Sequence, residues 1–550
     1  MSIKTYLKFT GLFIIATMCF HASAGNIDAN AAHMIANNYL KQHAQNSPVS
    51  FKAPSAADIR LAHAEPSSKI TGSNVYYVFN INGGGFIIVA GDDRATQVLG
   101  YSDKGKIDFN NMPEPLHDLL NNYKYDIEYL QTHQLSNTEL KTRQSLKGNH
   151  PGVEPMTVTS WGQETPYDWL TPTVDGKQCR VGCAGVCMSQ MIYFWKYPLS
   201  SGPLEPYFSS NMNDTVPGLP ATVFDYSIML RSYCHWDWDL SKLVQDTYTT
   251  EQALEVAKLC RYVGQATKMN YSPNGSGTTA ENKLNTMISF GYNPNAKTVQ
   301  WYSYNTETWE ELIRDELDAG RPVMYAAYCP VGHAFIVDGY DNEGLFHVNM
   351  GWFGDCDGWY HITAITLVNR YGEYRDYSLK NNMILYLEPP VFCASKTSGI
   401  NADNNLIILG EDFNPQASGV YLYTSHRSLD LLFTLTDAEG NDAAISTSLP
   451  VIRHTFDQGS DISLPISLPA TLPSGTYDVN FGYRTDGTSP TTLETAAGKL
   501  VVFGKFAKYN ATFNVSDVTT AIAYVLNGSP TGVTVNVADI TALINYILQQ

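Results

Sequence analysis

A helix that begins at a cysteine is predicted by the stretch Gly182-Cys183-Ala184-Gly185-Val186-Cys187-Met188-Ser189-Gln190-Met191-Ile192. Gly182 interrupts helix continuity, so we expect the helix to span 183–196. The unpaired N–H groups and the dipole of a helix N-terminus stabilise a thiolate. They favour Cys183 as a nucleophile over Cys187, which would lie one turn inside the helix.

Three cysteines, Cys179, Cys183 and Cys187, are spaced by four and allow three interpretations. They could bind a metal or an iron–sulfur cluster, they could be structural thiols or form one disulfide, or Cys183 could be a nucleophile among structural neighbours. Export of the chain, argued below, disfavours a cluster, so we predict no metal and no cofactor. Disulfides are common in secreted proteins, but the cysteine spacing assigns no pairs.

A general base for the thiol is predicted at His333. One strand begins near His333, a second strand ends near Asn349, and the turn Tyr340-Asp341-Asn342-Glu343 lies between the two strands. The two strands should form an antiparallel hairpin. In either turn register Asn349 lies opposite His333 or within one position of it, which favours Asn349 as the group that orients the imidazole. Asp338 is an odd number of positions along the strand and faces the other way. His347 is the rival base, and a buried structural histidine is the alternative interpretation of His333.

Donors for a developing oxyanion are also needed in acyl chemistry. The backbone N–H of Cys183 at the helix start is one candidate. Gln163, in the stretch Trp161-Gly162-Gln163-Glu164-Thr165-Pro166-Tyr167-Asp168, is a side-chain candidate. An ordinary surface glutamine is the competing interpretation.

The N-terminus has the pattern of a secretion signal over residues 1–24. Lys4 and Lys8 form a basic region, residues 9–20 are apolar, and Ala22-Ser23-Ala24 is a small-residue cleavage site. Nothing later in the chain is a transmembrane candidate. The net charge is −18 and no run of Lys or Arg occurs, which argues against nucleic acid and anionic membranes as partners.

Four further segments are expected after the signal, because 550 residues are too many for one ordinary core. Residues 25–150 read as a small α+β unit, and residues 151–388 as a larger α+β unit with helices first and then strands. Residues 389–503 alternate between apolar and polar residues, a pattern that predicts a β-sandwich of immunoglobulin type. Residues 504–550 read as a short helical repeat module.

The last segment contains an internal repeat, since Asn514-Val515-Ser516-Asp517-Val518 parallels Asn536-Val537-Ala538-Asp539-Ile540. Each copy predicts a short helix capped near its aspartate, and the pair resembles the helices of dockerin-like modules. A calcium loop needs acidic or amide ligands at alternating positions before that aspartate. The preceding stretches are nearly without carboxylates, so we expect no strong calcium site.

Several motifs together resemble the streptopain family of secreted cysteine peptidases, over roughly residues 30–388. In the first segment they are Gly85-Phe86-Ile87-Ile88-Val89-Ala90-Gly91-Asp92-Asp93-Arg94 and Leu99-Gly100-Tyr101-Ser102. In the second they are Gln163 with Pro166-Tyr167, Gly182-Cys183, Gln190-Met191-Ile192, Tyr197-Pro198, Met269-Asn270-Tyr271, Gly332-His333-Ala334-Phe335 and His347-Val348-Asn349.

The resemblance implies a papain-like fold for residues 151–388 and a dyad of Cys183 and His333, supported by Asn349 and by Gln163 in the oxyanion hole. It further implies contacts to the substrate backbone from Ser276 and Gly332. Residues 25 to about 150 would be an inhibitory propeptide, later removed. Protein and peptide substrates, and a secreted or cell-surface location on a bacterium, follow as expectations.

Two departures from the family pattern concern the site. The family usually has Val-Ala-Thr after the nucleophile, where this chain has Ala184-Gly185-Val186. It usually has Trp after the supporting Asn, where this chain has Met350, with Trp352 and Trp359 nearby. A weak or inactive binding protein on the same fold, or a cysteine-based redox protein, are the rival functions. The C-terminal domains are candidates for binding a cell-surface or host partner.

Overall fold

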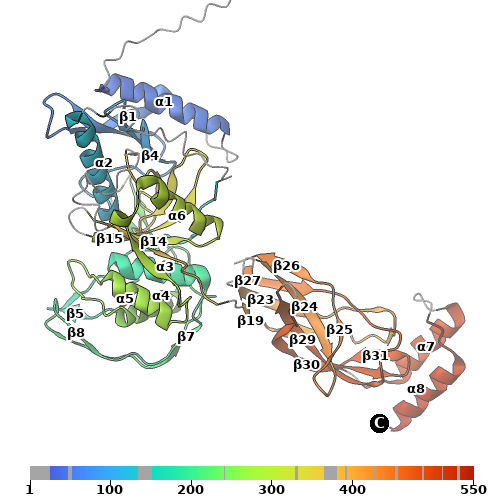
Figure 1. Cartoon of the computed structure of the whole chain (residues 1–550). Coiled ribbons are helices and arrows are strands. Elements are labelled where there is room, and N and C mark those ends of the chain that lie inside the picture. The colour runs from blue at the N-terminus through green and yellow to red at the C-terminus, as the bar shows by residue number, and fades with distance from the viewer. Residues whose placement is uncertain are drawn as a thin grey trace, which may run out of the picture.

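The computed structural model describes residues 25–46, 53–133, 135, 152–238, 240, 242–328, 332–364, 381–390, 393–424, 428–452, 456–485, 488–510, 512–528 and 533–549 (Figure 1). The predicted signal peptide, Cys329 and the predicted junction near residue 150 lie outside these residues. Every helix among the described residues is too short or too polar to cross a membrane.

The first unit is an antiparallel meander with one helix on each face. Alternate residues of the strands point to opposite faces, and both faces are apolar. Tyr77 and Phe79 face one core, while Tyr76 and Val78 face the other. The elements are α1 (Ala29–Asn46), β1 (Ile59–Pro66), β2 (Asn74–Ile81), β3 (Phe86–Ala90), β4 (Val98–Ser102) and α2 (Glu114–Thr132).

The meander continues directly into the sheet of the second unit, because β4 pairs with β17 in one ten-stranded sheet. Trp359 lies opposite Tyr101, and Tyr360 opposite Gly100. A Cβ at position 100 would lie 2.5 Å from the Tyr360 ring, so the seam requires glycine there. The sequence indicated two separate α+β units, whereas the first unit shares its sheet with the second. The order continues as β16, β15, β14, β18 and β13.

The helix predicted over 183–196 is confirmed as α3 (Cys183–Trp195), and it is followed by α4 (Thr250–Ala266), α5 (Ala280–Ser289) and α6 (Thr306–Asp318). The sheet strands are β13 (Lys297–Gln300), β14 (Val323–Tyr328), β15 (Gly332–Tyr340), β16 (Phe346–Asn349), β17 (Gly358–Tyr360) and β18 (Asn382–Leu385). Short hairpins surround them: β5 (Thr173–Val174), β6 (Lys177–Gln178), β7 (Ser200–Ser201), β8 (Tyr207–Ser209), β9 (Asp214–Val216), β10 (Thr222–Val223), β11 (Cys234–Asp237) and β12 (Lys242–Gln245).

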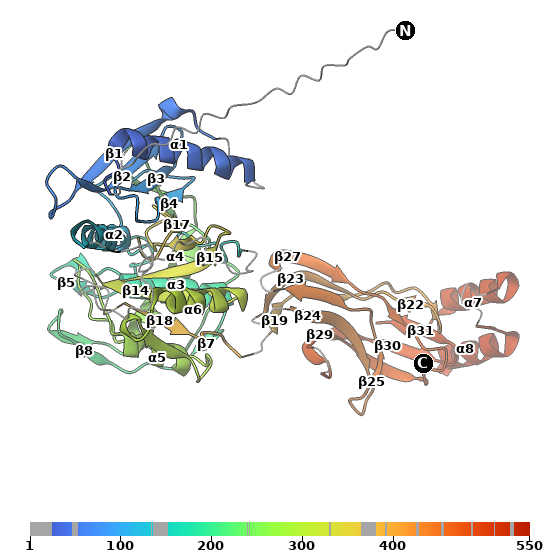
Figure 2. The same cartoon turned by 45° about the horizontal axis from the view of Figure 1, so that its top comes forward.

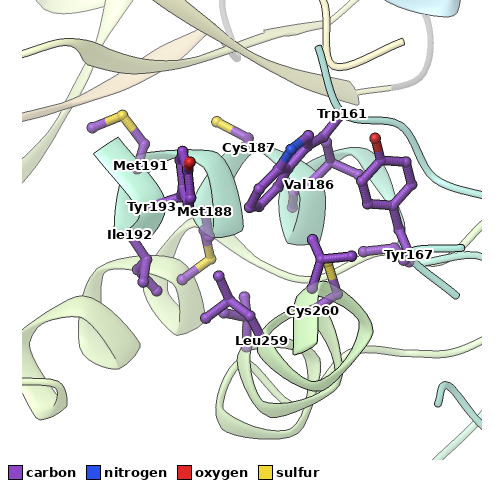
Figure 3. Close-up of a cluster of buried hydrophobic side chains, with 14 of the residues drawn as sticks. Trp161, Tyr167, Val186, Cys187, Met188, Met191, Ile192, Tyr193, Leu259 and Cys260 are labelled. Atoms are coloured by element: carbon purple, nitrogen blue, oxygen red, sulfur yellow. The ribbon is translucent and has the colours of Figure 1, made fainter. Parts of the chain in front are cut away.

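Helix α3 is the central element of the second unit. All of its residues after Cys183 are buried, because its two sides pack against β15 and against α4. Figure 3 shows Val186 and Met188 of α3 over Leu259 and Cys260 of α4, with Trp161 alongside. A helix that is apolar all round belongs in a core, so its first residue is held rigidly.

Beyond residue 392, the described strands form a four-stranded sheet, a seven-stranded sheet and the separate pair β22–β28 around one apolar core. They are β19 (Cys393–Lys396), β20 (Gly399–Asn401), β21 (Ile407–Ile408), β22 (Asp412–Phe413), β23 (Gln416–Thr424), β24 (Ser428–Thr436), β25 (Asp442–Ile445), β26 (Leu449–Ile452), β27 (Phe456–Ser463), β28 (Ile466–Ser467), β29 (Gly475–Arg484), β30 (Thr491–Phe503) and β31 (Phe506–Tyr509). Strand β31 pairs with β30, so this unit extends to Tyr509 rather than ending at residue 503. Tyr423 packs into the core of the second unit, and Lys396 bonds Asp225 at 2.9 Å.

Two helices, α7 (Val515–Asn527) and α8 (Val537–Gln549), lie at the far end of the β-rich unit (Figure 2). In each repeat an aspartate accepts the N–H of the asparagine before the helix, at 2.7 Å. The aspartates are paired with lysines of the β30–β31 region. Lys508 bonds both oxygens of Asp517 at 2.9 and 2.7 Å, and Lys505 bonds Asp539 at 3.1 Å.

Candidate active site

Cys183 is the first residue of α3, as the sequence predicted, and Gly182 sets its position. Gly182 has φ +84°, a region that favours glycine. A Cβ there would also lie 2.4 Å from the carbonyl oxygen of Ser276. The Cys183 Sγ accepts a hydrogen bond from the N–H of Ala334 at 3.4 Å. The thiol therefore lies at the start of β15, beside His333.

The thiol of Cys183 is held in its neutral form. Burial raises its pKa, and this outweighs the N–H groups of Ala334 and Ala184 and the charge of Lys283, which all lower it. The sequence predicted that the helix N-terminus would favour the thiolate. In this structure burial has the larger effect, because the imidazole is engaged elsewhere.

His333 faces the first unit. Its Nδ1 lies 3.4 Å from Oε2 of Glu114, and its Nε2 lies 3.8 Å from Oδ2 of Asp118. Both carboxyl groups lie on α2, one helical turn apart. Burial lowers the pKa of His333, while the Glu114 carboxylate opposes that shift. Burial and Glu114 raise the pKa of Asp118 to about 8, so at neutral pH Asp118 is mostly protonated beside a neutral imidazole.

The predicted register of His333 and Asn349 is wrong. Asn349 lies opposite Ile336, three positions from His333. The turn is longer than expected, with the N–H of Asp341 bonded to the carbonyl of Leu345. The pairing is also irregular between Val337 and Gly339. Together these features move Asn349 along the hairpin.

The side chain of Asn349 is buried and engaged by other groups. Its Nδ2 donates to the carbonyl of Thr159 at 2.7 Å, and its Oδ1 accepts from Gln190 at 3.2 Å and from the N–H of Gly351 at 3.0 Å. Gln190 also accepts from the Thr159 hydroxyl at 2.8 Å. Gln190 therefore fixes the orientation of Asn349, a role that sequence reasoning did not assign.

The rival base, His347, is bound to a carboxylate on the other face of the hairpin. Its Nδ1 lies 2.6 Å from Oδ1 of Asp338. Burial lowers the pKa of His347, but the charge of Asp338 and the hydrogen bond to it outweigh burial, so the pKa is raised. Asp338 also accepts from the N–H and hydroxyl of Thr157, at 2.7 and 2.5 Å. The pair therefore anchors the start of the second unit, and Thr157 links it to Asn349, whose Nδ2 donates to the Thr157 hydroxyl at 3.3 Å.

Gln163 is buried, and it lines a cavity of about 280 Å³ that it shares with Glu114 and Trp352. Its carbonyl accepts the N–H of Val181 at 3.0 Å, which holds it against the segment before the cysteine. Met350 is almost fully buried in the core. Trp352, which the sequence marked only as nearby, lines this cavity together with Trp236 and Phe353.

Ser276 and Gly332 border the cysteine without forming an open polar surface. The Ser276 hydroxyl donates to the carbonyl of Arg180 at 2.7 Å and accepts the N–H of Ser272 at 3.0 Å. Its role is therefore to hold the loop against Gly182. Gly332 is the first residue of β15.

The three cysteines spaced by four do not converge. Cys179 precedes the helix, and the Cys187 thiol donates to the carbonyl of Phe335 at 3.5 Å. Over the described ranges no three His, Cys, Asp or Glu side chains are grouped to hold a metal. Seven cysteines are free thiols: Cys179, Cys183, Cys187, Cys234, Cys260, Cys356 and Cys393.

Comparison with protein families gives two matches. Residues 161–360 match the Peptidase C10 family, and residues 24–127 match the family described as Spi protease inhibitor. The gap between the two matches, residues 128–160, begins inside the C-terminal part of α2 and ends directly before the stretch that contains Gln163.

Similar individual proteins cover most of the chain. Streptopain of Streptococcus pyogenes is 28% identical over 341 residues, which is 58% of this chain and 82% of streptopain. The thiol protease/hemagglutinin PrtT of Porphyromonas gingivalis is 24% identical over 528 residues, which is 91% of this chain and 58% of PrtT. Among solved structures, a prointerpain A fragment of Prevotella intermedia aligns with 60% of this chain and 100% of the fragment, at 25% identity and a TM-score of 0.47.

Proposed function

Since this chain is a streptopain-like cysteine peptidase of the Peptidase C10 family with an inhibitory propeptide domain, we propose that Cys183 and His333 are its catalytic dyad. The observation that carries this proposal is the hydrogen bond from the Ala334 N–H to the Cys183 thiol, because Ala334 follows His333 directly. The strand that carries the proposed base therefore contacts the proposed nucleophile through its backbone, which supports the pairing.

In the proposed reaction His333 takes the proton of Cys183, and the thiolate attacks a peptide carbonyl carbon. The N–H of Cys183 and the side chain of Gln163 donate to the oxyanion. The C–N bond then breaks, and His333 gives its proton to the leaving amine. Water, activated by His333, hydrolyses the thioester and restores the thiol.

We further propose that the structure represents the latent form. The carboxyl groups of Glu114 and Asp118 on α2 lie against the ring of His333, at 3.4 and 3.8 Å, and burial keeps the thiol neutral. Removal of α2 would free the ring to turn toward Cys183 and would admit solvent to the thiol. Orientation of that ring by Asn349, and backbone contacts from Ser276 and Gly332, are part of the same proposal.

The remaining assignments are also proposals. They are a papain-like fold for residues 151–388, a β-sandwich followed by a helical repeat, secretion directed by residues 1–24, and a surface-binding role of the C-terminal domains. Secretion is supported by the relatives streptopain and PrtT and by the sequence of the N-terminus.

The test is mass spectrometry of the full chain, with casein as substrate, in three variants. Wild type should cleave casein and process itself at a site between α2 and Thr157. Cys183→Ala should lose both activities by at least about 10³-fold, since it removes the proposed nucleophile. Cys187→Ala, the matched control, should retain both. Processing that survives Cys183→Ala would refute the dyad.

A further inference from the structure

We propose that the cavity beside Gln163 is a subsite that selects a large apolar side chain on the leaving-group side of the scissile bond. The inference rests on the proposed function and goes beyond it by naming a substrate preference. The cavity measures about 280 Å³. Ligand cavities are usually about 300–1,000 Å³, so this one suits a single side chain.

The position of the cavity sets which part of a substrate would enter it. Gln163 and Trp352 form one wall, and Glu114, the residue that holds His333, forms another. Ser276 and Gly332, the proposed contacts to substrate backbone, do not line it. Because the imidazole protonates the leaving amine, the space between His333 and the oxyanion donor belongs to the leaving segment.

Without the propeptide residues Asn111, Met112 and Glu114, four of the seven residues that line the cavity are apolar. Trp236 and Leu243 are directly opposite each other in the β11–β12 hairpin, so their side chains project from the same face. Both line the cavity, together with Trp352 and Phe353. Trp236 also packs edge-on against Trp238, with ring centroids 6.0 Å apart, which limits its rotamers.

Once Glu114 has left with the propeptide, the two charged residues that still line the cavity neutralise each other. Arg180 and Glu164 form an ion pair of 2.8 Å, and both are partly exposed. An acidic or basic substrate residue would therefore gain little charge attraction and would lose hydration on entry. An aliphatic or aromatic residue would gain from burial, by about 25 cal/mol per Å² of apolar surface.

The propeptide already presents such a side chain to the cavity. Asn111 and Met112 precede α2 and form the propeptide side of the cavity wall. Met112 is partly buried against the neighbouring core. Departure of the propeptide would remove this methionine and leave the apolar walls for a substrate side chain of the same character.

The test uses the mature enzyme with internally quenched peptides that differ only in the residue directly after the scissile bond. Leu or Phe should give a kcat/KM at least about tenfold above that of Asp or Gly, within the range that apolar pockets reach. Leu243→Asp should reduce this preference to less than about threefold. Leu254→Ala, an exposed leucine on α4, is the matched control and should keep it.

A second measurement separates loss of the subsite from misfolding. A peptidyl chloromethyl ketone occupies only the acyl side of the site. It should therefore alkylate Cys183 of the Leu243→Asp variant at the same rate as Cys183 of the wild type. Equal kcat/KM for all four peptides in wild type would overturn the subsite while leaving the peptidase intact. Failure of wild type to cleave any peptide would overturn the proposed function and the subsite with it.

Discussion

Lys283 is a buried cation close to the nucleophile, on helix α5, and only 5% of it is exposed. Burial lowers its pKa, while the thiols of Cys187 and Cys183 oppose that shift. Its charge in turn lowers the pKa of Cys183. Burying a lysine is costly, and its electrostatic effect on the Cys183 thiol offers a reason for its position.

We therefore predict that Lys283→Met raises the pKa of Cys183. Loss of the charge should slow iodoacetamide alkylation of Cys183 at pH 8 by about two- to tenfold, since one pKa unit changes the thiolate fraction about tenfold. The rate is measured by mass spectrometry of the peptide containing Cys183, across a pH series. Lys177→Met, at an exposed lysine on β6, should leave the pH dependence of the alkylation rate unchanged. An unchanged pH dependence in Lys283→Met would show that Lys283 does not lower the pKa of Cys183.

The functional residues of the site could be predicted from the sequence where a short stretch of neighbouring residues identifies them. A glycine before a cysteine at a helix start, and a histidine at a strand start, are features of short stretches. The place of Asn349 depends on the length of a turn and on one strand irregularity, and each shifts the register. Glu114 and Asp118 escaped notice because their contact with His333 is long-range. The one feature of the sequence that could have pointed to this contact is the position of Asp118 beside the apolar stripe of its helix.

At the scale of elements, α2 combines two roles. Its apolar stripe packs on the meander, with Leu116, Leu120 and Tyr123 buried. Its first turn presents Glu114 and Asp118 to His333. The same helix therefore stabilises the first unit and holds the proposed base, so latency and the packing of α2 are physically linked.

The raised pKa of Asp118 predicts how proenzyme stability depends on pH. The folded chain keeps the Asp118 proton up to about pH 8, whereas an exposed aspartate loses it near about pH 4. Between these values the folded state binds more protons, so this group's contribution to stability falls as the pH rises from about 4 to 8. Asp118→Asn is neutral throughout and lacks this dependence.

The measurement is thermal melting of the proenzyme from pH 5 to 9, in a Cys183→Ala background that prevents processing. The melting temperature of Asp118→Asn relative to the parent should increase steadily up to pH 8 and then level off. Asp214→Asn, at an exposed aspartate on β9, should run parallel to the parent. If the melting temperature of Asp118→Asn also ran parallel to that of the parent across the pH range, the pKa of Asp118 would not be raised in the folded chain.

At the scale of the whole molecule, the ten-stranded sheet joins the propeptide to the peptidase through β4 and β17. Strands β2 and β3 are nearly continuous apolar runs, which suit a sheet buried on both faces, and the stretch Asn82-Gly83-Gly84-Gly85 between them suits a hairpin turn. Their pairing across the seam could not be predicted, because edge strands far apart in sequence carry no mutual signal. Gly100 is the one local indication, since it leaves room for Tyr360.

At the far end of the molecule, lysines pair with the aspartates of the two repeats. Lys508 and Asp517 are each about 95% buried and form two hydrogen bonds. Lys505 makes the corresponding pair with Asp539 in the second repeat. The sequence predicted that no strong calcium site would form, and the lysines offer a physical reason why the helices would not need one.

Lys508→Met should therefore loosen α7, because it leaves the Asp517 carboxylate buried and unpaired, at a cost of about 3–5 kcal/mol. Hydrogen exchange of residues 515–527 should accelerate, while EDTA should leave wild-type exchange unchanged. Adding Asp517→Asn, which keeps the acceptor for Asn514 without the charge, should recover part of the protection. Lys499→Met removes an exposed pair, 59% and 41% accessible, and should have little effect. Faster exchange of wild type in EDTA would instead show that a cation stabilises the repeat.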